Sequence, residues 1–241
     1  MNRYTSLQEA SAVRPDVALD PLWGLGEVLV DGRSTPVPIT WDDMDRDIAW
    51  ARTALLEHGI GRGDSLVLVA GANEGGWAHA FLRAAAELGA ASGMAWSVGF
   101  DARRVSTLCR RLRPALAIGL TAATVATLAD LDGGIAGSLG GVGLVLARAD
   151  ARDALAAAGI RAGVFDLVGP VPVIDGPACE GAAYDESSWT VEVDPDSHLV
   201  VTPAPHRGFR LARFDSGRLG RVVDGTPARV VLAEVDRPAP T

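Results

Sequence analysis

The serine at position 97 is the residue whose neighbours come closest to a catalytic motif. Ala95-Trp96-Ser97-Val98-Gly99 lies between a predicted strand and a predicted helix, one residue short of the G-x-S-x-G turn that presents a hydrolase nucleophile. The acid and base of a triad could follow in hydrolase order, from Asp166 or Asp175 and from His198 or His206. That turn requires the serine directly before the helix, whereas we expect Asp101 to cap the helix here. We therefore interpret Ser97 as structural and keep a serine hydrolase as a distant alternative.

The other residue types that ligate metals or act as nucleophiles are scattered. The four histidines share no ligand spacing, so they predict no metal site: His58, His79, His198 and His206. Cys109 lies on the apolar face of a predicted helix, far from Cys179, which indicates a buried thiol rather than a disulfide. All 22 residues counted as Lys or Arg are arginines, which excludes Schiff-base chemistry. We assign no catalytic residue and no metal ligand.

Arginines are concentrated in the last part of the chain. Six of them follow one another between positions 207 and 229, at Arg207, Arg210, Arg213, Arg218, Arg221 and Arg229. Only Asp215 and Asp224 oppose them within this stretch. The cluster indicates either a solvated, self-paired face or a patch that docks an anion or a partner, since guanidinium groups suit carboxylates and phosphates.

Bulk properties indicate a soluble globular protein. The 241 residues are 48% hydrophobic and 22% charged, and the formal net charge of −8 argues against non-specific binding to nucleic acid. No basic segment followed by an apolar stretch opens the sequence, and the weakly polar run at 115–131 is predicted to be a strand and a helix. We expect a cytoplasmic protein that binds neither nucleic acid nor membrane.

The elements that would position these residues centre on 64–90. Leu66–Ala70 is a short unbroken apolar run, which is typical of a strand buried on both faces of a parallel sheet. Asn73 is placed to cap the following helix, whose apolar stripe ends at Gly89. An earlier helix is expected to begin at Thr40, where Thr-x-x-Asp resembles a capping box.

Strand and helix alternate along the middle of the chain. Further strands are predicted at 90–96, 115–120, 142–147 and 164–168, with helices between them and a glycine-rich loop at 133–141. The fold class is therefore α/β, a mostly parallel sheet flanked by helices.

Three parts are expected. Residues 1–38 form an irregular lead-in with one short strand near Glu27–Val30, and residues 39–169 form the sheet domain. Residues 170–241 form a β- and loop-rich extension, either on the sheet edge or as a small appendage, with a frayed end at 237–241.

The order of pieces in 39–120 resembles the N-terminal part of the adenylate-forming superfamily, the AMP-forming acyl-CoA synthetases and their relatives. Ile39–Met44 is similar to that family's helix opening. Gly59–Ala70 is similar to its G-V-x-x-G-D turn and the strand that follows the turn. Asn73–Trp77 with Phe81 matches the next helix, and Glu87–Ala90 its L-G-A ending. Phe100–Leu120 resembles the helix and strand that follow. The resemblance implies an acyl-CoA synthetase-like fold that is truncated relative to the family.

In that family a loop rich in Ser, Thr and Gly and ending in lysine grips the phosphates of ATP. The resemblance places that loop and the strand before it at 198–208. The strand is recognisable, but in the loop only Thr202 and Gly208 are of the expected types, with His206 and Arg207 beside them. Pro203 and Pro205 remove two of the backbone N–H donors that such a cradle needs. The resemblance therefore implies the family's fold without its catalytic apparatus.

Two functions from different classes follow. The first is a binding protein that is inactive by itself and requires no cofactor. It would bind a protein partner such as a full-length enzyme, a second copy of the chain, or a small acyl or nucleotide ligand. The second is one subunit of a split AMP-forming acid–thiol ligase, in which ATP, AMP or CoA would be bound together with another polypeptide.

Overall fold

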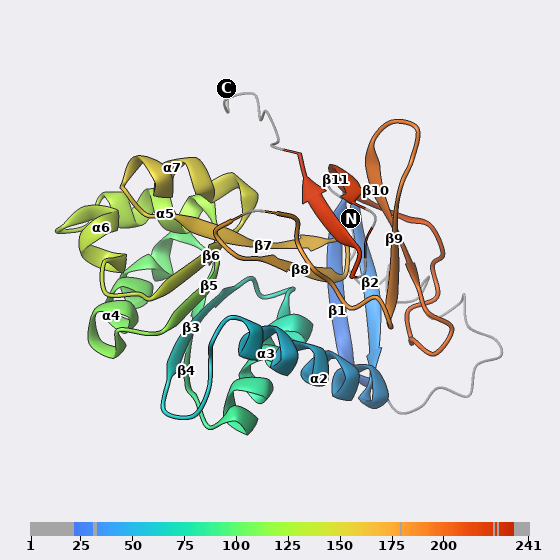
Figure 1. The fold of residues 1–241 in the computed structure, drawn as a ribbon, viewed down its shortest axis with the longest axis horizontal. Coiled ribbons are helices and arrows are strands. Elements are labelled where there is room, and N and C mark those ends of the chain that lie inside the picture. The colour runs from blue at the N-terminus through green and yellow to red at the C-terminus, as the bar shows by residue number, and fades with distance from the viewer. Residues whose placement is uncertain (1–21, 31–32, 179, 224, 226, 234–241) are drawn as a thin grey trace.

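A six-stranded sheet forms the centre of the computed structural model, which describes residues 22–30, 33–178, 180–223, 225 and 227–233 (Figure 1). Its strands, in spatial order, are β4 (Ala91–Trp96), β3 (Ser65–Ala70), β5 (Leu116–Leu120), β6 (Leu144–Ala147), β7 (Ala162–Val168) and β8 (Val171–Asp175). The first five run parallel, and β8 returns antiparallel to β7. The prediction of a mostly parallel sheet is confirmed.

The central strand β3 is buried on both faces, as its sequence predicts. Leu66, Leu68 and Ala70 pack into one apolar core, whereas Val67 and Val69 pack into another. Alternate side chains of a strand point to opposite faces, so this single strand contributes to both cores.

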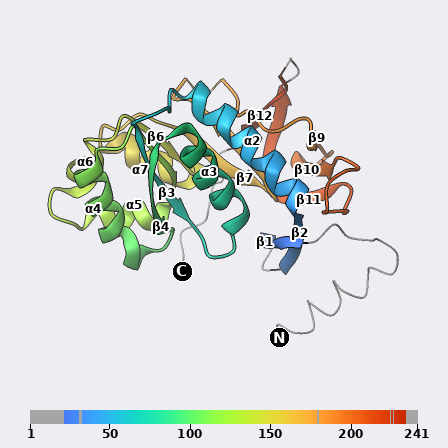
Figure 2. The same ribbon diagram turned by 90° about the horizontal axis from the view of Figure 1, so that it is seen from below.

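Helices cover both faces of the sheet (Figure 2). The first core lies under two long helices, α2 (Trp41–Glu57) and α3 (Gly75–Leu88). The second core lies under four shorter ones, α4 (Ala102–Leu112), α5 (Ala122–Ala129), α6 (Gly134–Leu139) and α7 (Arg152–Ala157). The helix α6 corrects the expected loop at 133–141: Ser138 and Leu139 are buried, and this burial stabilises a short helix despite its glycines.

The helix starts agree with the sequence in one case and differ in two. Thr40 and Asp43 form the expected capping box at the start of α2. Asn73 does not cap α3: Glu74 occupies that position, and the Asn73 side chain donates instead to the Glu27 carbonyl at 3.4 Å. Asp101 precedes α4, but its carboxylate accepts from the Trp96 backbone N–H at 2.7 Å rather than from the helix.

The lead-in is more regular than expected over the part that the structure describes. Instead of one short strand, residues 22–40 contain an antiparallel hairpin of β1 (Leu22–Val30) and β2 (Arg33–Thr40). The prolines at positions 36 and 38 are tolerated because a two-stranded hairpin consists of edge strands.

The C-terminal extension is β-rich, as predicted, and contains no helix among its described residues. An antiparallel sheet of four strands has the order β12 (Arg229–Leu232), β11 (Phe214–Val223), β10 (His198–Pro203) and β9 (Trp189–Val193). It packs over a third apolar core that includes Val37 of the hairpin and Val171 of β8. Cys179, Asp224 and residues 237–241 lie outside the described residues.

Candidate functional site

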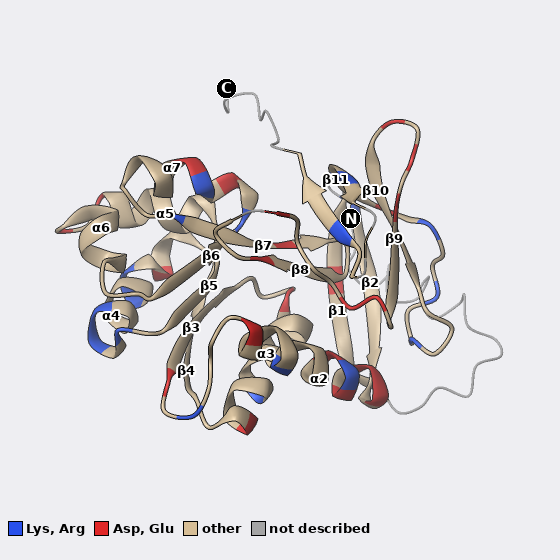
Figure 3. Cartoon of the chain, in the orientation of Figure 1, with Lys and Arg blue, Asp and Glu red and all other residues tan. Residues whose placement is uncertain are grey.

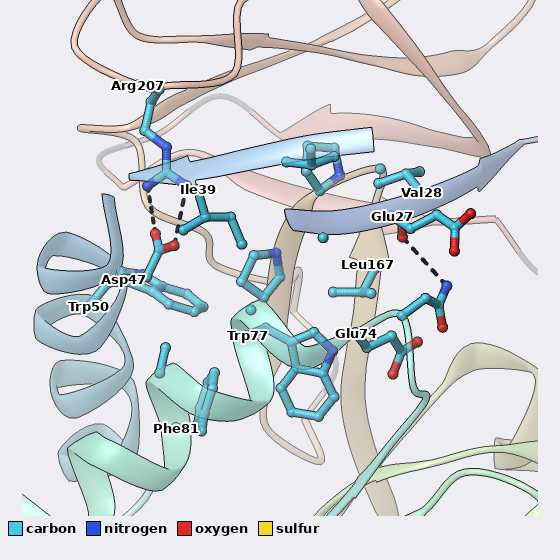
Figure 4. A pocket seen from close by; sticks show the side chains of 18 residues that line it. Glu27, Val28, Ile39, Asp47, Trp50, Glu74, Trp77, Phe81, Leu167 and Arg207 are labelled. Carbon is cyan, nitrogen blue, oxygen red and sulfur yellow. Dashed lines mark hydrogen bonds and ion pairs between the residues drawn. The ribbon is translucent and has the colours of Figure 1, made fainter. Parts of the chain in front are cut away.

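The segment that the sequence assigns to the phosphate loop lies against the helix α2. After β10 the chain turns, and Arg207 becomes buried with only 5% of its surface exposed. Its guanidinium donates to both carboxylate oxygens of Asp47 on α2, at 2.6 and 3.2 Å (Figure 4). It also lies 4.7 Å from the centre of the Trp189 ring, a cation–π distance. Both terminal nitrogens of Arg207 are therefore engaged within the protein, whereas its buried Nε has no hydrogen-bond partner in the described structure.

Gly208 is held by the same helix. Its backbone N–H donates to Asp43 Oδ2 at 2.8 Å, the carboxylate that also closes the capping box with Thr40. A side chain here would not fit, because a Cβ would lie 2.9 Å from both Asp43 Oδ2 and Thr40 Cγ2. The N–H that a phosphate would need is thus bound to a carboxylate.

The remaining two residues of the predicted loop do not converge on this point. The Thr202 hydroxyl accepts a hydrogen bond from the Arg213 backbone N–H at 3.1 Å, while His206 is exposed. The four residues of the predicted loop therefore do not form a common anion site in the structure.

Asp43 and Asp47 make the surroundings of this loop acidic. Asp43 is 1% exposed and ion-pairs with Arg46 as well as with Arg207, whose Nε lies 3.5 Å from it. Burial raises the pKa of Asp47, and the neighbouring Arg207 opposes that rise. Two carboxylates thus occupy the side of the loop that lies against α2, and each is paired with an arginine.

A small cavity of about 60 Å³ lies next to the Arg207–Asp47 pair, between the hairpin, α2, α3 and β8 (Figure 4). Its wall is mostly apolar and includes Trp50, Trp77 and Phe81. The Trp77 indole N–H is buried without a hydrogen-bond partner in the described structure. The volume suits a few water molecules and is far smaller than the sites that hold drug-sized ligands.

A second buried ion cluster lies at the carboxyl ends of the parallel strands. Asp166 on β7 accepts from Arg148 at 3.5 Å and from Arg218 at 2.5 Å, and it also accepts from two backbone N–H groups. Arg148 donates onward to Glu74 at 2.7 Å and lies over the rings of Trp77 and Phe165. Because every charge has a partner, this cluster ties the start of α3, β7 and β11 together.

The residues of the hydrolase alternative are not brought together. Asp166 is occupied by arginines, and Asp175 accepts from the Gly181 N–H. His198 pairs with Asp215 at 3.1 Å, and this hydrogen bond raises the pKa of the imidazole. Among the described residues, no hydrogen bond joins Ser97 to a histidine; its carbonyl accepts from Thr121.

Most members of the arginine cluster have partners within the protein. Besides Arg207 and Arg218, Arg213 pairs with Glu192 at 2.9 Å, while Arg210 and Arg229 donate to backbone carbonyls. This arrangement matches the self-paired alternative and offers no concentrated patch.

The other candidate residues also have structural roles. Cys109 is a buried free thiol, and burial raises its pKa to about 12. His58 contacts the Ala54 carbonyl. The His79 ring lies 4.8 Å from the Trp23 ring in a tilted arrangement, and the pKa of His79 is lowered by burial and then by Arg83. No group of residues in the described part of the chain could hold a metal ion. No helix there is long and apolar enough to cross a membrane.

The sequence does not single out three members of these clusters, which are Asp47, Glu74 and Arg148. Asp47 lies one helical turn after Asp43, so both carboxylates lie on the same side of α2. That spacing indicates a pair of carboxylates on one side of a helix. It does not predict that Arg207, 160 residues away, would pair with them.

Comparisons with known proteins show which solved structures share this fold. No known protein-family profile matches the sequence, and no curated protein matches it either. Among solved structures, 2-hydroxyisobutyryl-CoA ligase in complex with 2-HIB-AMP and CoA has a TM-score of 0.64 and 22% identity. ATP-bound MatB from Rhodopseudomonas palustris has a TM-score of 0.52 and 16% identity, and o-succinylbenzoate CoA synthetase from Bacillus subtilis a TM-score of 0.56 and 12% identity.

The matches extend over nearly all of this chain but only part of the others. They cover 95%, 94% and 91% of this chain and 61%, 52% and 50% of those three structures, in the order given. The chain thus spans about half to three fifths of the length of the ligases it matches. The predicted resemblance is confirmed at the level of architecture: this chain has the fold of the adenylate-forming acyl-CoA ligases over the portion that it shares with them.

Proposed function

We propose that this chain acts by binding and does not activate an acid with ATP on its own. The observation that carries the proposal is the Arg207–Gly208 contact with α2. The guanidinium and the N–H at the phosphate-loop position are bound to Asp47 and Asp43, so they are not available to a triphosphate.

Three further features support the proposal. Pro203 and Pro205 lack backbone N–H donors, and the sequence contains no lysine to contact a phosphate. Phosphate cradles work by directing several N–H groups and a positive charge at one point, whereas two carboxylates lie behind this loop. A buried free thiol suits the reducing cytoplasm, where we expect the protein to act.

Thermal-shift measurements with ATP, AMP and CoA test the proposal, with 2-hydroxyisobutyryl-CoA ligase as the positive control. A ligand that binds the native state raises the melting temperature by mass action. We expect shifts for the ligase and none for this chain, together with no ATP–pyrophosphate exchange by this chain alone. A clear shift with ATP, or exchange by the purified chain, would contradict the proposal.

A subunit of a split ligase is the second candidate, and the coverage favours it specifically. Nearly the whole chain matches about half of each ligase, so a second polypeptide could supply the rest of such an enzyme. In that case ATP–pyrophosphate exchange would appear only after mixing with a polypeptide that carries the nucleotide motifs. Exchange on mixing would favour this candidate over a purely non-catalytic role.

A further inference from the structure

The strand β4 forms an unprotected edge of the six-stranded sheet. Its one strand neighbour among the described residues is β3. Its sequence, ASGMAW, contains neither a charge nor a proline, the devices that usually keep a sheet edge from pairing with another chain. Ala91, Ser92 and Trp96 are exposed. The edge therefore offers a template for another strand.

The backbone of β4 shows which groups are available. The N–H of Ala91 donates to the Asp64 carbonyl and that of Ser97 to the Ala70 carbonyl, so odd-numbered residues face β3. Ser92, Met94 and Trp96 consequently direct their N–H and C=O groups outward. The Trp96 N–H is already bound to the Asp101 carboxylate, which ends the outward ladder. Within the described chain, the free outward groups are the N–H and C=O of Ser92 and Met94 and the C=O of Trp96.

We infer that this edge pairs with the same edge of a second copy of the chain, antiparallel, with Gly93 at the twofold axis. In this register Ser92 of each copy faces Met94 of the other, and their outward groups form two hydrogen-bonded pairs. The two Gly93 residues form the intervening close pair, in which Cα atoms approach to about 4.5 Å. The twofold axis is perpendicular to the sheet, so each side chain keeps its face.

The side chains around Gly93 favour a second copy over an unrelated strand. A Cβ at Gly93 would lie 3.3 Å from Leu108 and 3.7 Å from Leu112, so these two residues of α4 lie beside the axis. Leu112 is 43% exposed. The twofold axis that pairs the backbone groups also brings the two Leu112 side chains together. The hydrogen bonds and the apolar contact are thus self-complementary about a single axis.

The dimer should be weak. Arg104 and Arg111 lie one helical turn from Leu108, and the arginines gathered on α4 bring like charges together across the axis (Figure 3). Strand pairing over a few residues buries less than the roughly 1,200 Å² of a stable interface. Because salt screens exposed charges, association should strengthen at higher ionic strength. The inference rests on the strand edge alone and does not depend on whether the chain binds nucleotides.

Sedimentation equilibrium of the full chain over a range of concentrations tests the inference, with Ser92→Pro and Ser92→Thr as a matched pair. Proline removes an outward N–H that β3 does not use, whereas threonine keeps it. We expect a concentration-dependent dimer for the wild type and Ser92→Thr, and dimerisation at least about tenfold weaker for Ser92→Pro. A wild type that is monomeric at millimolar concentration would overturn the inference, as would a Ser92→Pro variant that is folded and dimerises normally.

Cross-linking tests the register and remains informative if Ser92→Pro does not fold. In a background without Cys109 and Cys179, Gly93→Cys should form a disulfide-linked dimer under mild oxidation, since its partner lies across the axis. Ala156→Cys, exposed on α7, serves as the collision control. Leu112→Gln should weaken the dimer while leaving the strand backbone unchanged. Equal cross-linking of the two cysteine variants would contradict this register, and unchanged association of Leu112→Gln would contradict the contact between the α4 helices.

Discussion

Arg207 and Asp47, 160 residues apart, form a two-point ion pair with distances of 2.6 and 3.2 Å. The pair joins the turn after β10 to the middle of α2, and Trp189 lies beneath the guanidinium at 4.7 Å. A residue that sequence order assigns to phosphate binding therefore holds the C-terminal sheet against α2.

Replacing Arg207 by glutamine should cost about 3 kcal/mol of unfolding free energy, because two carboxylates then lose their buried partner. Urea unfolding measures the loss. Arg221, which is exposed, provides the control: Arg221→Gln should change the stability by about 0.5 kcal/mol or less. Equal effects in the two variants would show that the buried pair contributes nothing.

Gly208→Ala should destabilise the protein by about 1–3 kcal/mol, because the added methyl group meets the Asp43 carboxylate and the Thr40 methyl group at 2.9 Å. Gly61→Ala is the matched control, since a Cβ at Gly61 has no neighbour within 4 Å. The same urea experiment compares the two. The described packing would be refuted if Gly208→Ala were as stable as Gly61→Ala.

Asp166→Asn should cost about 3 kcal/mol, because Arg148 and Arg218 lose a shared carboxylate that is 1% exposed. Thermal or urea unfolding tests this expectation, and Asp132→Asn, at an exposed position, should be close to neutral. A neutral Asp166→Asn variant would mean that the cluster does not contribute to the junction between β7 and β11.

The Cys109 thiol should resist alkylation in the native protein. Burial raises its pKa to about 12, so the reactive thiolate is rare at neutral pH and the sulfur is inaccessible. Treatment with iodoacetamide at about pH 8, followed by peptide mass spectrometry, should find the Cys109 peptide unmodified before unfolding in urea and modified afterwards. Rapid labelling of the folded protein would contradict the described core.

The His198–Asp215 pair predicts a pH dependence of stability. The hydrogen bond with Asp215 raises the folded-state pKa of His198 above its ordinary value of 6.5. Its stabilising effect is therefore fully present below pH 6.5 and is lost as the pH rises through the folded-state pKa. The difference in urea midpoint between wild type and His198→Asn should shrink from acidic to alkaline pH. Asp215→Asn should remove the same pH-dependent increment, and a pH-independent difference would argue against the pair.

Local patterns predict the sheet and fail where distant contacts decide the conformation. The apolar run at 66–70 and the capping box at Thr40 depend on neighbouring residues, and both appear in the structure. Asn73 has the residue type of a cap, but the hairpin carbonyl at Glu27 competes for its amide. The helix α6 forms because Leu139 is buried in the second core, which its glycine content does not reveal.

Sequence order predicts where the candidate site should lie, but it does not predict which side chains contact it. Order predicts a strand followed by a loop within 198–208, and the structure contains that strand as β10, which includes Thr202. What occupies the turn depends on Asp43 and Asp47, carboxylates that belong to a helix more than 150 residues earlier. Spacing rules describe neighbours along a chain, so they cannot anticipate such a pairing.

The division of β3 between two cores has a consequence for how this protein can vary. A larger side chain at Leu68 would push the strand away from the first core. Val67 and Val69 would then press into the second core, and the helices that cover it would have to move. Substitutions in the two layers are therefore not independent: each layer sets the space that the other must accept. A change of side-chain volume in one core, without a compensating change in the other, would displace β3, which the two cores share.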